Sequence, residues 1–150
     1  MYRSRLLPFT MLLGFSVLLS GGCPVNLGEL LGLNVITLEI INDTDYDIDP
    51  YIVFDDDSDF LAGWFPSEEL STGVLAPGEV LTYTFDCDQL GLVQADEPEQ
   101  YVGFFVYTAD STSTIAQGDE YECGDLVQFQ FLGNADSFGV LVAVNGVVVD

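Results

Sequence analysis

The sequence predicts an all-β fold, an antiparallel β-sandwich of about seven or eight strands. Short runs alternate apolar and polar side chains, as strands do when one face is buried. Apolar residues occupy every second position in Val80–Cys87, and Leu126–Leu132 repeats the pattern with Val127, Phe129 and Phe131. Turn-forming residues separate these runs, and no long helical period follows residue 33. This arrangement is typical of two packed antiparallel sheets.

Two segments add local detail to the prediction. Tyr101–Thr108 is apolar on both faces, so we expect a central strand there. Asn145 and Gly146 both tolerate positive φ and predict a two-residue hairpin turn. A helical turn is predicted only at Pro66–Leu70. The remaining predicted strands are Val35–Ile41, Tyr51–Phe54, Val140–Val144 and Val147–Val149.

Charge is distributed very unevenly along the chain. The basic side chains are Arg3 and Arg5 alone, there is no His, and all 25 carboxylates lie at Glu29 or later. Without the two arginines, the net charge changes from −23 to −25. Nucleic-acid binding is therefore excluded, because no cation would meet the phosphates. A Ser-His-Asp or Cys-His catalytic group cannot be assembled either.

The first 23 residues predict export. Met1–Arg5 is a short positive segment, and the uncharged run Leu6–Leu19 is 14 residues long. That length is typical of a signal peptide and short for a transmembrane helix. Leu19-Ser20-Gly21-Gly22-Cys23 then resembles the bacterial lipobox, in which an aliphatic residue and small residues precede a lipidated cysteine. Here the aliphatic residue lies one position further upstream than is usual.

The resemblance implies three parts of the chain. Residues 1–22 would be a cleaved lipoprotein signal peptide, 23–33 a tether lipidated at Cys23, and 34–150 an acidic β-sandwich domain. The domain would be held in the bacterial cell envelope, facing the periplasm or the cell surface, with the membrane as its partner through the lipid. An ordinary secretory signal or an uncleaved membrane anchor is the alternative.

The cysteine count agrees with lipidation. An exported chain with three cysteines has one left over after pairing, and lipid on Cys23 accounts for it. Cys87 and Cys123 share the core-facing parity of their strands, so we expect both to point inward and form a structural disulfide. Two separate buried thiols are the alternative.

Eight aspartates lie within 17 residues, in two clusters. The first alternates from Asp43 to Asp49, and the second is Asp55–Asp59. Oxygen ligands of this kind suit Ca²⁺, although neither cluster matches an EF-hand loop. A solvated acidic face is the alternative, and no other cofactor is expected. The candidate metal ligands are Asp43, Asp45, Asp47, Asp55, Asp57 and Asp59.

Two further functions remain open from the residues alone. Trp64 lies beside the second aspartate cluster, and an exposed Trp next to carboxylates is a candidate ligand-binding residue for sugars. Such aromatics more often cap the open end of a sandwich core. Paired carboxylates alone can also hydrolyse glycosides, but abundant surface aspartate produces such pairs by chance.

The region after residue 33 resembles, in its strand pattern and its Leu75–Glu79 turn, the immunoglobulin-like sandwiches of exported bacterial proteins. That fold implies no single activity. We expect a membrane-anchored, non-catalytic envelope or surface module rather than an enzyme, with a protein or glycan partner that the sequence does not identify. A carbohydrate-binding or adhesive module is the first alternative and a carboxylate-only hydrolase the second.

Overall fold

The computed structural model describes residues 34–56, 68–134 and 136–150. Within these residues the chain forms twelve strands and no helix, which confirms the all-β prediction. Several strands are only two residues long, so the count exceeds the predicted seven or eight. The strands are β1 (Val35–Asn42), β2 (Asp47–Asp49), β3 (Ile52–Asp55), β4 (Glu68–Glu69), β5 (Val80–Asp86), β6 (Leu92–Ala95), β7 (Glu99–Val102), β8 (Phe105–Thr108), β9 (Ile115–Ala116), β10 (Leu126–Leu132), β11 (Gly139–Val144) and β12 (Val147–Val148).

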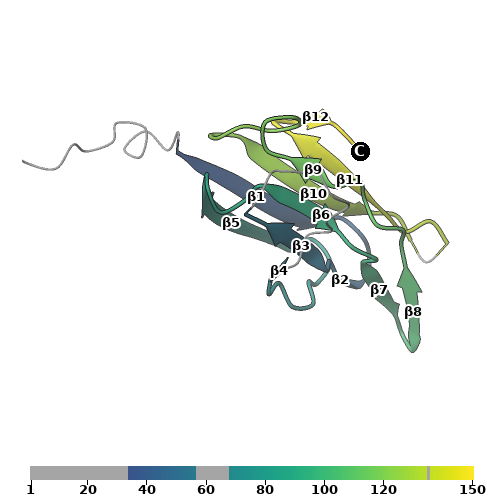
Figure 1. Ribbon diagram of the computed structural model, residues 1–150. Coiled ribbons are helices and arrows are strands. Elements are labelled where there is room, and N and C mark those ends of the chain that lie inside the picture. Colours follow the sequence, from purple (N-terminus) through teal and green to yellow (C-terminus); the bar gives the residue numbers. More distant parts are fainter. Residues whose placement is uncertain (1–33, 57–67, 135) are drawn as a thin grey trace, which may run out of the picture.

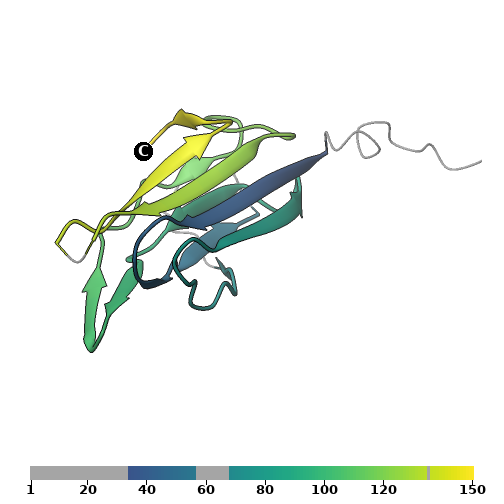
Figure 2. The same ribbon diagram turned by 180° about the vertical axis from the view of Figure 1, so that it is seen from behind.

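The strands form the layers of a β-sandwich (Figure 1). A five-stranded sheet has the order β12-β11-β10-β1-β5, and a four-stranded sheet has the order β4-β3-β6-β9. A third sheet, β2-β7-β8, lies at one end, and its β7–β8 hairpin extends beyond the two layers (Figures 1 and 2). We call β2-β7-β8 the hairpin sheet.

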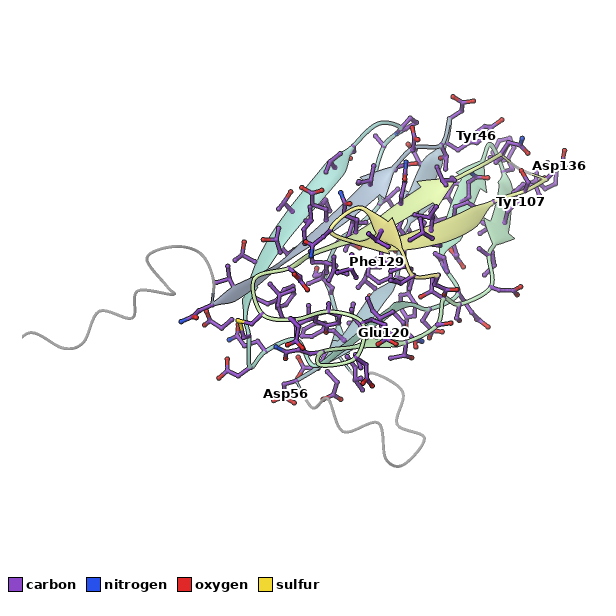
Figure 3. All side chains as sticks on the ribbon, turned by 90° about the horizontal axis from the view of Figure 1, so that it is seen from above. Tyr46, Asp56, Tyr107, Glu120, Phe129 and Asp136 are labelled. Atoms are coloured by element: carbon purple, nitrogen blue, oxygen red, sulfur yellow. A yellow bond between two sulfur atoms is a disulfide. The ribbon has the colours of Figure 1, made fainter. Side chains whose placement is uncertain are left out.

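The core lies between the two larger sheets. The predicted alternation of β1 is confirmed, because Ile36, Leu38 and Ile40 are all fully buried. On β10 the alternate residues, Phe129 among them, are buried in the same way, and Figure 3 shows Phe129 between the layers. The pairing of β1 with β10 is parallel, with Ile40 beside Phe129. Alternation predicts which face is buried, but it carries no information about strand direction.

The predicted central strand Tyr101–Thr108 is wrong. The segment turns back on itself at Gly103, whose φ of 64° suits glycine, and forms the β7–β8 hairpin. Its apolar residues are therefore not all buried. A run that is apolar on both faces is normally buried on both sides, and this hairpin departs from that rule.

Of two predicted local turns, one is wrong and one is confirmed. The helical turn predicted at Pro66–Leu70 is wrong where the structure describes it, because Glu68–Glu69 is strand β4 and pairs with β3. The turn predicted at Asn145-Gly146 is confirmed. Both residues have positive φ, at 51° and 78°, and Val144 pairs with Val147 across them.

A buried amide fixes the turn after β1. Asn42 is fully buried, and its Nδ2 donates to the carbonyl oxygens of Tyr46 at 2.8 Å and Leu75 at 3.0 Å. Its Oδ1 accepts from the backbone N–H and the hydroxyl of Thr44, at 3.0 and 2.8 Å. Gln100 on β7 is also fully buried, but neither polar atom of its side chain has a hydrogen-bond partner among the described residues.

Substitution of the two buried amides should change the free energy of unfolding in opposite directions. Asn42→Ala leaves the backbone N–H of buried Thr44 without its acceptor and removes one donor each from the carbonyls of Tyr46 and Leu75. We therefore expect a loss of about 2–4 kcal/mol in the free energy of unfolding. Gln100→Met removes two unpartnered polar atoms at similar volume and should raise the same quantity by about 1 kcal/mol or more.

Urea unfolding of the variants measures both changes. The control is Asn134→Ala, at an exposed turn where Asn134 accepts a bond from Asp136 N–H at 2.9 Å, with an expected loss under about 1 kcal/mol. Equal losses for Asn42→Ala and the control would contradict the role of the Asn42 network.

Candidate functional site

The structure places the first aspartate cluster on the outside of the chain. From Asp43 to Asp49 the odd-numbered residues are exposed or half-buried, while Asn42, Thr44 and Ile48 between and beside them are buried. The period of two therefore extends through the turn between β1 and β2. The aspartates project outward, as the alternating pattern predicts for an extended chain.

The predicted metal ligands do not assemble in the part of the chain that the structure describes. There, no three Asp, Glu or Cys side chains lie close enough together to hold a metal ion. Asp43 instead accepts a hydrogen bond from Gln130 Nε2 at 3.1 Å, and Asp55 ends β3. Asp57 and Asp59 lie outside the described residues. The calcium site and the solvated acidic face both stay predictions.

A different group of carboxylates does come together, at the base of the hairpin sheet. Four acidic residues and one tyrosine line an open cavity of about 360 Å³. Asp49 at the end of β2 lies opposite Glu99 at the start of β7, so two like charges face each other across the pair. We call this cavity the acidic pocket, and its lining residues are Asp49, Tyr51, Asp96, Glu97 and Glu99.

The rim of the acidic pocket holds two residues in a backbone conformation that side chains rarely adopt. Tyr51 has a φ of 39° and Glu97 a φ of 47°. Such conformations cost about 1 kcal/mol or more each, so local hydrogen bonds must hold them. Tyr51 C=O accepts from Asp96 N–H at 3.0 Å, and Glu97 N–H donates to Ser111 Oγ at 3.1 Å. The pocket is therefore built and fixed by contacts between separate segments.

The carboxylates Glu99 and Asp49 affect the pKa of Tyr101 on β7. Its hydroxyl donates to Glu99 Oε2 at 2.9 Å. Partial burial, this hydrogen bond and the negative charges of Glu99 and Asp49 together raise the pKa of Tyr101 to about 12. Elsewhere, burial raises the pKa of Tyr121, with a smaller contribution from the charge of Glu120. The Tyr121 hydroxyl donates to the Leu90 carbonyl at 2.9 Å.

The tip of the hairpin sheet is apolar and open to solvent. The side chain of Phe104, in the turn, is fully exposed, and those of Phe105 and Val106 on β8 are 69% and 52% exposed. β8 is the outer strand of this sheet and pairs with β7 alone. Contiguous exposed aromatic surface of this kind usually marks an interaction site. The acidic pocket and this apolar tip are the candidate functional features of the described chain.

Comparison with known proteins finds a distant structural similarity. No protein-family model matches the chain, and neither does any curated protein sequence. Among solved structures, the cytotoxin suilysin from Streptococcus suis is similar at a TM-score of 0.45 and 13% identity. The similar region covers 73% of this chain but only 23% of the toxin.

Besides Asp57 and Asp59, two further predicted site residues lie outside the described part of the chain. They are Cys23, the predicted lipidation site, and Trp64, the candidate sugar-binding residue. None of the described residues forms a helix long and apolar enough to cross a membrane. The acidic pocket and the apolar tip were not predicted as sites. Glu97-Pro98-Glu99 has the composition of a turn, and Asp49 and Tyr51, which line the pocket with it, come from a distant segment.

The predicted disulfide is present between Cys87 and Cys123. Their Cα atoms are 5.5 Å apart, and their sequence separation is 36. Cys87 keeps the parity of β5 and is half-buried like Leu81 and Phe85, whereas Cys123 is exposed, so the prediction that both point inward is wrong for Cys123. Cys123 lies in the loop before β10, so the parity of that strand does not govern its direction. The bond links the end of β5 to the loop before β10, on either side of β1.

Removing the disulfide should destabilise the domain mainly through chain entropy. The double variant Cys87→Ser/Cys123→Ser loses little packing, because neither side chain is fully buried. Opening a loop of 36 residues is expected to cost about 4 kcal/mol in the free energy of unfolding, as measured by urea titration. Reduced wild-type protein is the control and should show the same loss. A loss under about 1 kcal/mol in both would contradict this account.

Alkaline titration tests the raised pKa values of Tyr101 and Tyr121. Unfolded phenols ionise near pH 10, whereas those of Tyr101 and Tyr121 ionise higher in the folded protein. Their contribution to stability is therefore complete below about pH 10 and is lost as the pH rises toward 12 and beyond. Between about pH 8 and about pH 11, Tyr101→Phe and Tyr121→Phe should keep the wild-type absorbance change at about 295 nm. A decrease by one phenol's share, with the fold intact by circular dichroism, would contradict the assignment.

Proposed function

We propose that this protein is an exported lipoprotein whose immunoglobulin-like β-sandwich is held at a membrane by lipid on Cys23. In this proposal the domain is a non-catalytic envelope or surface module that binds a partner. The observation that carries it is the disulfide, which uses Cys87 and Cys123 and leaves Cys23 as the remaining one of three cysteines. A disulfide also suits the oxidising side of a bacterial membrane.

The way the chain enters the sandwich supports attachment at this end. β1 follows the predicted tether directly, and it pairs with β10 on one side and with β5 on the other. Gly124 N–H donates to the carbonyl of Val35 at 3.0 Å, beside the disulfide. A pull on the tether would therefore act on a strand that is paired along both edges and clamped near its start. Such an attachment point resists local unfolding better than an edge strand does.

The available side chains favour binding over catalysis. After Arg5 the chain has no Lys, Arg or His, so a nucleophile would lack the basic partner that usually activates it. The hairpin sheet instead offers a wide, open acidic pocket and an exposed apolar tip. These features present charge and apolar area to another molecule, which is the chemistry of recognition.

Lipidation is tested by cell fractionation and intact-mass analysis. Wild-type protein should require detergent for extraction and should begin at an acylated Cys23. Cys23→Ser removes the acceptor thiol, so it should shift the protein into the detergent-free fraction, because acyl chains supply the membrane affinity. The double variant Cys87→Ser/Cys123→Ser is the matched control and should remain with the membrane. A wild-type chain that begins at Met1, or that carries a free thiol at Cys23, would overturn the proposal.

A further inference from the structure

The outer edge of β8 is unprotected. Edge strands normally carry charged residues, proline or bulges that prevent pairing with another chain. β8 runs from Phe105 to Thr108 without any of these, and within the described chain its only neighbour is β7. Its backbone N–H and C=O groups on the outer side are therefore a template for one more strand.

The two faces of the hairpin sheet differ in chemistry. Residues directly opposite each other on paired strands share a face. Asp49 lies opposite Glu99, and Tyr101 lies between Asp47 and Val106, so these residues share one face, which we call the acidic face. Neighbouring residues along a strand point to opposite sides, so Phe105 and Tyr107 project from the other face. On this face Ile48 and Gln100 are buried, while Phe105 is exposed. We call it the apolar face.

We infer that β8 binds a β-strand of a partner protein in which basic and apolar residues alternate. A strand added beside β8 would place every second side chain on the acidic face and the others on the apolar face. Glu99 lies two strand spacings away, about 10 Å, which the side chains of a partner Lys and Glu99 together can span. The apolar residues of the same strand would cover Phe105, and Phe104 extends this contact at the tip.

Charge complementarity selects this occupant over two others. A second copy of this chain offers no basic side chain beyond Arg5 and would bring two strongly negative domains together. A membrane surface with anionic headgroups would be repelled by Asp47, Asp49 and Glu99 for the same reason. The hairpin also lies at the end of the sandwich opposite the start of β1, where the predicted tether joins (Figures 1 and 2). A strand of another protein that alternates basic and apolar residues would complement both the acidic face and the apolar face.

The experiment uses labelled decapeptides and the full chain carrying Cys23→Ser, which has no acyl chains. The probe alternates Lys with Val, one control peptide alternates Lys with Ser, and another alternates Glu with Val. Fluorescence anisotropy at about 0.15 M NaCl measures binding, where exposed charges more than about 8 Å apart are screened. We expect the Lys-Val peptide to bind at least about tenfold more tightly than either control.

Two double variants test the location of the site, and a third is the matched control; circular dichroism checks that each keeps the fold. Phe104→Ser/Phe105→Ser keeps the net charge and should weaken Lys-Val binding at least about tenfold. Asp49→Asn/Glu99→Gln should weaken it several-fold and reduce its salt dependence. Val147→Ser/Val148→Ser removes two exposed apolar residues from β12, another edge strand, and should leave binding unchanged.

Several outcomes would overturn the inference. Equal binding of the Lys-Val peptide by wild type and Phe104→Ser/Phe105→Ser would show attraction to the acidic surface as a whole. Absence of Lys-Val binding, or equal binding of the Glu-Val peptide, would remove the basic strand as the occupant. Self-association in sedimentation that is lost in the same variant would assign β8 to a second copy. Hairpin-dependent binding to phosphatidylcholine vesicles would assign it to a lipid surface.

Discussion

The structure depends on one constraint: from residue 34 to 150 no side chain carries a positive charge. Carboxylates in most proteins are neutralised by Lys or Arg, but here neutral donors must take that role. Gln128 Nε2 donates to Glu39 at 2.9 Å, and backbone N–H groups in turns donate to others. These turn bonds are Ala76 N–H to Glu79 at 2.9 Å, Ala116 N–H to Glu120 at 2.8 Å and Glu122 N–H to Asp125 at 2.7 Å. The acidic residues thus close turns while remaining solvated.

The same constraint determines which polar groups enter the core. A buried carboxylate without a cation is very costly, whereas an amide or hydroxyl needs only hydrogen bonds. Among the residues that the structure describes, the buried polar ones are accordingly Asn42, Thr44, Gln94 and Gln100. Asn42 and Thr44 bond to each other and to the backbone around them, so this network joins the turn after β1 to the segment at Leu75. The buried amide of Asn42 has the ordering role here that ion pairs have elsewhere.

Much of the fold could be predicted from local alternation, and little of the candidate site could. β1 and β10 follow the period of two because one face of each is buried, and Asn145-Gly146 identifies its turn by its φ preferences. Strand direction and the acidic pocket depend on which distant segments meet. Asp49 and Glu99 become neighbours only because β2 pairs with β7, and Cys123 turns outward because it lies in a loop.

The prediction of a central strand at Tyr101–Thr108 is wrong because an uncharged run in this protein need not be buried. Residues 100–109 and 137–149 both lack charge. In the second run β11 buries Val142, Ala143 and Val144 in the sandwich, so packing explains the missing charge. In the first run β8 stays open to water, although this chain protects the exposed side of edge strand β5 with Thr82, Thr84 and Asp86. An edge strand with unpaired backbone groups can aggregate by pairing with other chains, and a bound partner strand would prevent this by occupying those groups.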